Sequence, residues 1–144
     1  ISYIGNFVGS FILGGLFVWS NASHQILVDY YRSFIYTKLD ATPMELFVRG
    51  VLCNFLVCLA VYTGMKLKSE SGKMIMMFCI ITAFVLAGFE HCVANMGTFT
   101  IGYMLLGDIG TAAVIKSQFF VTLGNIVGGA VLLAFPLKQM SAEH

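Results

Sequence analysis

Residues 84–96 read FVLAGFEHCVANM and place an acid and a base in the middle of an apolar stretch. The acid is Glu90, the base is His91, and Gly88 just before them permits a break in a helix. Ionisable residues inside a membrane segment are costly and are usually functional. An interrupted helix at mid-membrane is also where transporters place their binding sites. If the chain lies in a membrane, this stretch is therefore the first candidate for its function.

The composition indicates that the chain does lie in a membrane. Of its 144 residues, 58% are hydrophobic and 10% are charged, whereas about 25% of residues are charged in soluble domains. The net charge of +1 comes from short scattered clusters, which excludes a basic surface for nucleic acid. The four cysteines lie in apolar runs without a Cys-x-x-Cys pair. We expect neither a metal nor a cofactor, and no enzymatic activity.

Four apolar segments are long enough to cross a bilayer core of about 30 Å. They cover about residues 2–20, 44–65, 73–106 and 118–137. We expect the third segment to be broken near residues 88–98. Residues 24–37 carry apolar and aromatic side chains at helical spacing, which predicts an amphipathic helix in the membrane interface. The predicted fold is one all-α transmembrane domain over residues 1–144.

Lysines indicate the orientation of these segments. Lys66, Lys68 and Lys73 lie between the second and third segments, and Lys138 follows the fourth. Positive charges favour the cytoplasmic side of a membrane. We therefore expect the C-terminus to be cytoplasmic.

A short motif, Gly-Asn-x-Val-Gly, occurs at residues 5–9 and again at 124–128. The two segments that contain it are three spans apart and would cross the bilayer in opposite directions, as in an inverted three-helix repeat. By this logic, two further helices precede residue 1 in a complete protomer. The glycines are also explained by close helix packing alone. The asparagines point to a polar cavity, because a buried amide is costly unless it is paired.

Helical geometry suggests how the polar residues of the central stretch divide their roles. In a continuous helix, His91 and Asn95 share a face and Glu90 points about 100° away. We interpret Glu90 as a structural acceptor, for example for Asn54, and His91 as a pore residue near Asn95 or Asn125. The alternative is that His91 is a core residue bonded to Asn95.

Three stretches of the chain resemble the formate/nitrite transporter family: RGVLCNFLVCLA at 49–60, GFEHCVANM at 88–96 and VTLGNIVGG at 121–129. The resemblance spans the whole chain and is closest to the clostridial hydrosulfide channel branch. It implies an aquaporin-like protomer of six helices, two of them broken near mid-membrane, and this chain would hold the last four. It also implies a homopentamer in the inner (cytoplasmic) membrane, with one pore in each subunit.

The resemblance also implies roles for individual residues. The family's central pore histidine corresponds to His91, its acid partner to Glu90, its asparagine to Asn54, its vestibule lysine to Lys38, and its apolar constrictions to Phe84 and Val57. A threonine that bonds the histidine belongs to a helix before residue 1.

These residues lead us to expect a channel for small monovalent anions of weak acids, namely hydrosulfide, formate or nitrite. A bare anion in a low-dielectric passage carries an idealised penalty of about 20 kcal/mol. Lys38 would gather anions by its field, Phe84 would strip their water, and His91 would donate a hydrogen bond or a proton.

Other functions fit parts of the pattern. One is an aquaporin-like channel for neutral solutes, although the Asn-Pro-Ala motif of that family is absent from this sequence. Another is the membrane anchor subunit of an oxidoreductase, which would also have apolar helices and a buried histidine. Lys38 alone is equally explained as a solvated loop charge or a lipid anchor.

Overall fold

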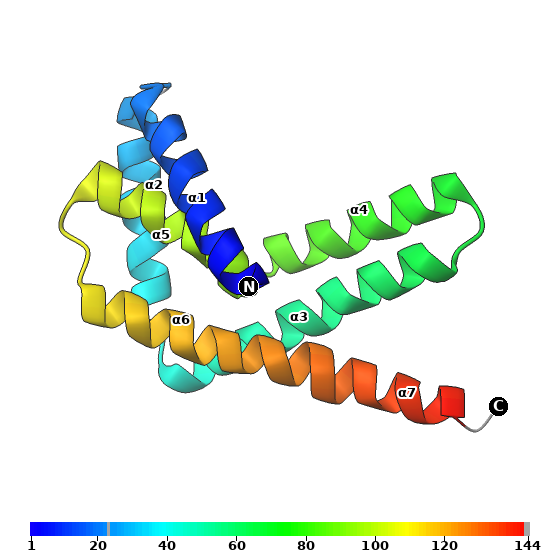
Figure 1. The fold of residues 1–144 in the computed structure, drawn as a ribbon. Coiled ribbons are helices and arrows are strands. Elements are labelled where there is room, and N and C mark those ends of the chain that lie inside the picture. Colours follow the sequence, from blue (N-terminus) through cyan, green and yellow to red (C-terminus); the bar gives the residue numbers. More distant parts are fainter. Residues whose placement is uncertain (23, 143–144) are drawn as a thin grey trace. The chain divides into compact units, whose positions relative to one another are not determined.

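A computed structural model describes residues 1–22 and 24–142, and the regular secondary structure of this part of the chain is entirely helical (Figure 1). The elements in order are α1 (Ser2–Trp19), α2 (His24–Leu39), α3 (Pro43–Lys66), α4 (Glu70–Leu86), α5 (Cys92–Leu106), α6 (Thr111–Ile126), the π-helix η1 (Val127–Ala134) and α7 (Phe135–Ala142). In the described residues, three helices are long and apolar enough to cross a membrane: Ser2–Trp19, Pro43–Lys66 and the continuous Thr111–Ser141.

The chain divides into two compact units. Unit 1 contains Ile1–Pro43 and Cys92–Phe119, and unit 2 contains Met44–His91 and the chain from Phe120 onward. Each unit thus combines segments that are far apart in the sequence. The single domain over residues 1–144 stays a prediction.

In unit 1, α5 lies between α1 and α2. Gly14 of α1 faces Thr100, so closely that a Cβ atom on the glycine would be 3.1 Å from the threonine Cγ2. Gly15 faces Met104 one turn further on, so α1 and α5 run parallel. α2 runs antiparallel to α5, because Arg32 bonds Asp108 while Lys38 bonds Asn95.

The expected helix at residues 24–37 is present as α2, but one of its faces is buried. Ile35 is 0% exposed and forms a cluster with Leu39, Phe99 and Ile109. A substantial part of its apolar surface is thus covered by protein. The location of α2 in the membrane interface stays a prediction.

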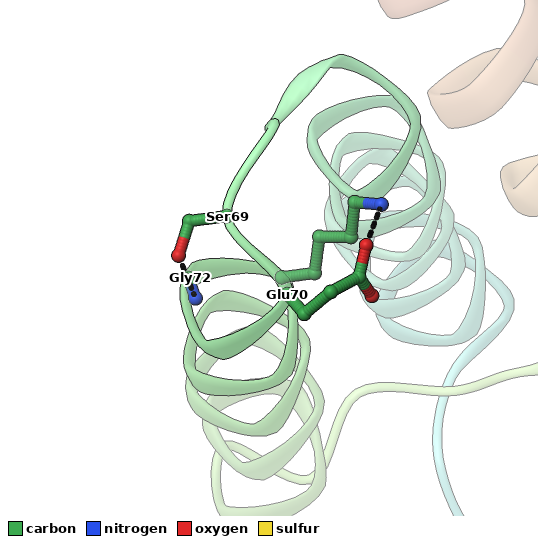
Figure 2. A network of polar contacts seen from close by, with 4 residues as sticks. Ser69, Glu70 and Gly72 are labelled. Carbon is green, nitrogen blue, oxygen red and sulfur yellow. Dashed lines mark hydrogen bonds and ion pairs between the residues drawn. The ribbon is translucent and has the colours of Figure 1, made fainter.

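In unit 2, α3 and α4 form an antiparallel hairpin. Gly64 near the end of α3 faces Met77 of α4, and the backbone N–H of Glu90, just beyond α4, donates to the Arg49 carbonyl near the start of α3. α4 begins at Glu70, three residues before the expected start at Lys73. Figure 2 shows the reason: the Ser69 side chain accepts a hydrogen bond from the Gly72 N–H and caps the helix.

Glycines bring α3 and the α6–η1 helix into backbone contact. A Cβ atom on Gly124 would clash with the Phe47 carbonyl, and one on Gly128 with the Val51 carbonyl. Both sequence numbers increase together along this contact, so the two helices run parallel. Packing of small residues lets helices approach closely where lipid supplies no hydrophobic drive between them.

The third apolar segment is not one helix, because it is interrupted at residues 87–91. Gly88 adopts φ of +68°, its N–H donates to the Val85 carbonyl, and the Phe89 N–H donates to the Phe84 carbonyl. This is a Schellman ending, in which a glycine in the left-handed region closes the helix. The break begins at the expected glycine, but it ends at Cys92, well before residue 98.

The fourth apolar segment is longer than expected, since α6 already begins at Thr111. The polar residues Lys116 and Gln118 suggested that the span begins near residue 118, but the protein provides hydrogen-bond partners for both side chains. Lys116 donates to two backbone carbonyls, and Gln118 donates to the Tyr3 hydroxyl and the Cys92 carbonyl. Polar side chains with such partners can lie within an otherwise apolar helix.

The glycine contact gives a prediction for stability. Gly128→Ala should lower the thermal stability of the detergent-solubilised protein, because its Cβ would meet the backbone of α3 at Val51 and Phe55. Overpacking of this kind costs about 1–3 kcal/mol. Gly64→Ala is the matched control: its Cβ would lie at an ordinary 3.5 Å from Met77 Sδ, and alanine is the better helix former. Equal melting temperatures for the two variants would refute the contact.

Candidate functional site

Asn125 connects three segments of unit 2. Its side-chain Nδ2 donates to the Gly50 carbonyl of α3 and to the Glu90 carbonyl in the break, both at 2.9 Å. Its own backbone carbonyl accepts a 2.7 Å hydrogen bond from Asn54 Nδ2. Asn125 is 4% exposed. The amide thus satisfies backbone groups that lipid would leave without partners.

The backbone of the break is held from two sides. The Glu90 N–H donates to the Arg49 carbonyl at 3.4 Å, and the Glu90 carbonyl accepts from Asn125. Glu90 is 1% exposed, whereas His91 is only half-buried. No hydrogen bond joins the His91 imidazole to any residue that the structure describes. A fixed backbone thus carries an imidazole whose two nitrogens remain available to other groups.

Two of the expected pairings differ from the structure. Asn54 donates to the Asn125 carbonyl and not to Glu90. His91 precedes α5, which begins at Cys92, so it does not share a helical face with Asn95. The alternative of a core histidine bonded to Asn95 is also not observed in the described residues, since Asn95 Oδ1 accepts from Lys38.

The site of Lys38 in unit 1 is formed by α2 and α5. Lys38 Nζ donates to Asn95 Oδ1 at 3.3 Å and lies 4.9 Å from the centre of the Phe34 ring, one turn earlier on α2. Phe34 in turn stacks on Tyr30 at 5.5 Å. Asn95 is 1% exposed, whereas Lys38 is half-buried. The ammonium is therefore directed by an amide oxygen and an aromatic face, an arrangement favourable for a cation.

The Tyr31 side chain of α2 carries no charge. Burial, together with a smaller contribution from neighbouring Tyr30, raises the pKa of Tyr31. The phenol of Tyr31 is therefore neutral at physiological pH.

The two expected constriction residues lie in unit 2. Phe84 is in the last turn of α4, where its carbonyl accepts the closing bond of the Schellman ending, and Val57 is in α3. Both side chains are half-buried. Their role as constrictions stays a prediction.

A cavity of about 420 Å³ lies in unit 1, lined mainly by aromatic and methionine side chains of α1 and α5. It is lined by Tyr3, Phe7, Phe11, Met96, Phe99, Thr100, Tyr103, Met104, Val114 and Gln118. None of the residues predicted for the pore is among them.

The sequence did not identify two features of these sites. Phe34 lies one turn before Lys38, and this spacing could have indicated the cation–π contact. The π-helix begins two residues after Asn125. Neither composition nor hydrophobic spacing distinguishes a π-helix from an α-helix, so only the adjoining Gly128 and Gly129 hinted at an irregularity.

The chain was compared with known proteins. The family model described as "Formate/nitrite transporter" matches residues 1–138. The chain is 34% identical to the "Uncharacterized transporter YwcJ" of Bacillus subtilis, over 99% of this chain and 57% of that protein. It is 31% identical to the nitrite transporter NirC of Escherichia coli, over 92% of this chain and 50% of that protein.

A solved structure described as "Pentameric formate channel with formate bound" has the same fold, with a TM-score of 0.83 and 30% identity. The match covers 97% of this chain and 64% of that one. The present chain spans about half the length of the relatives named above. On the match of residues 1–138, and with helices apolar enough to cross a bilayer, the chain is a multi-pass membrane protein that belongs to the formate/nitrite transporter family.

Proposed function

We propose that the complete protein is a membrane channel for small monovalent anions of weak acids. The observation that carries this proposal is His91, an imidazole without a described hydrogen-bond partner on a backbone break in an apolar chain. The similarity to a nitrite transporter and to a channel solved with formate supports the same class of substrate. Formate, nitrite and hydrosulfide are the candidates, and the hydrosulfide assignment comes from resemblance alone.

Lys38 would raise the local concentration of anions. Its ammonium donates a hydrogen bond to the neutral amide oxygen of Asn95. A positive charge at the entrance to a low-dielectric passage increases the arrival rate of anions and falls in effect as salt is added. Lys38 needs no direct contact with the anion at mid-membrane for this role.

His91 would lower the free-energy cost of moving the anion through the apolar passage. An imidazole can donate one hydrogen bond to an anion or, when protonated, transfer its proton. For formate, the imidazolium N–H bond breaks, a carboxyl O–H bond forms, and neutral formic acid and neutral imidazole result. The neutral acid avoids the large desolvation penalty of the anion, and it returns the proton to water beyond the constriction.

The assembly and placement of the protein belong to the same proposal. The similar formate channel is described as pentameric, which supports a homopentamer. An inverted repeat and two helices before residue 1 are proposed from the repeated motif, and a cytoplasmic C-terminus is proposed from the lysines. An aquaporin-like fold and a location in the inner membrane are proposed from the family resemblance. Phe84 and Val57 are proposed as the apolar constrictions.

The central test is anion flux through the intact protein in proteoliposomes. Formate, nitrite and hydrosulfide should each dissipate an imposed gradient, while the osmotic shrinkage rate with an impermeant neutral solute should match that of protein-free vesicles. Rapid water or glycerol movement without anion flux would instead favour the neutral-solute channel. Flux measured from pH 5 to pH 8 would show whether protonation accompanies transport.

Replacement of the histidine gives the next prediction. His91→Phe keeps an aromatic ring but removes both nitrogens, and a hydrogen bond to a charged group contributes about 1.5–3 kcal/mol. We expect formate flux to fall roughly tenfold to a hundredfold. His91→Gln, which retains a donor, should keep more of the flux than the phenylalanine variant. Wild-type flux in His91→Phe would remove the imidazole from the mechanism.

Replacement of Lys38 should change how the flux depends on the formate concentration. Lys38→Met removes the charge at similar length, and one charge at close range contributes about 1 kcal/mol in water. We expect the half-saturating formate concentration to rise about fivefold at low salt, and the difference should shrink in 1 M salt. Lys38→Arg is the control that retains the charge. A salt-independent change would contradict an electrostatic role.

A further inference from the structure

A second lysine is bonded to the end of the helix that carries Lys38. Lys116 of α6 donates from Nζ to the Leu39 carbonyl at 2.9 Å and to the Ala41 carbonyl at 3.1 Å. Leu39 is the last residue of α2. Carbonyls at a helix C-terminus lack partners in the helix and form its negative pole, so an ammonium there satisfies and stabilises them.

The hydrogen bonds from Lys116 fix the end of α2, and thus the backbone position from which the Lys38 side chain extends. Leu39 follows Lys38 directly, and its side chain is 5% exposed in the cluster with Ile35 and Phe99. The last turn of α2 is thus fixed on one side by apolar packing and at its end by Lys116. Lys38 is the basic residue of that turn.

The hydrogen bond from Lys38 to Asn95 is sensitive to small displacements. Its 3.3 Å distance to Asn95 Oδ1 is longer than the usual 2.9–3.0 Å for N–H···O bonds. A slight movement of the helix end would carry it beyond bonding range. A residue that fixes this end therefore helps to keep Lys38 Nζ within bonding range of Asn95 Oδ1.

We propose that Lys116 is a positioning residue that holds the C-terminal end of α2 and thereby directs Lys38 toward Asn95. The inference rests on the proposed role of Lys38 in attracting anions. Lys116 acts here through the backbone at Leu39 and Ala41, and it needs no contact with the transported anion.

A double-mutant cycle on the intact protein in proteoliposomes tests this inference, with formate as the probe. The variants are Lys116→Met, Lys38→Met and the two combined, and the readout is the half-saturating concentration at low salt. Lys116→Met should raise it about threefold, the size expected for a charge at a helix terminus. The same change should have no further effect in the Lys38→Met background, because residues that act through one another are not additive.

Two further variants identify the cause. Lys116→Arg keeps the donors and should restore the wild-type value. Lys68→Met removes an exposed lysine for which the structure describes no partner, and it should change nothing. If Lys116→Met fails to assemble as judged by size-exclusion chromatography, Lys116→Gln replaces it in the cycle, with a smaller rise expected that again vanishes without Lys38.

The outcomes separate this inference from the proposed function. An unchanged Lys38→Met variant would refute the role of Lys38 itself. If Lys38→Met is altered but replacement of Lys116 has no effect, the positioning role is overturned. It is also overturned if the effect persists in full without Lys38, because Lys116 would then act by its own field.

Discussion

An apolar chain that interrupts its own helix must supply hydrogen bonds to the backbone that it frees. At residues 87–91 this requirement is met by the Schellman ending at Gly88 and by the amide of Asn125. Each unsatisfied group in lipid would cost several kcal/mol. The break is therefore stable only because a distant side chain reaches it, and the position of the half-buried His91 depends on that support.

The support in turn depends on the close approach of two helices. Gly124 and Gly128 let the α6–η1 helix lie against the backbone of α3, and this contact brings Asn125 within 2.9 Å of the Gly50 carbonyl. Larger side chains at the glycines would separate the helices and withdraw the amide from Glu90. The Gly-Asn-x-Val-Gly copy at residues 124–128 thus combines close packing and polar satisfaction in the same turn, two explanations that the sequence left side by side.

Much of this fold was predictable, because apolar length and helix breakers are local properties. The spans near residues 2–20 and 44–65 correspond to α1 and α3, and Gly88 marks the start of the break. The beginning of α6 was not predictable: Lys116 looked like a boundary until its two carbonyl partners were known. The bond from Asn54 to the Asn125 carbonyl and the bond from Lys38 to Asn95 join residues more than 50 positions apart. Contacts of this kind cannot be read from a single sequence.

The π-helix that follows Asn125 has a geometric consequence for the rest of the C-terminal segment. Its hydrogen bonds span five residues instead of four, so each residue from Val127 to Ala134 turns the helix by less than the 100° of an α-helix. A helical wheel drawn through the whole segment at a constant angle would therefore assign α7 to the wrong side. Any assignment of lipid-facing and protein-facing positions beyond Ala134 has to be restarted at Phe135.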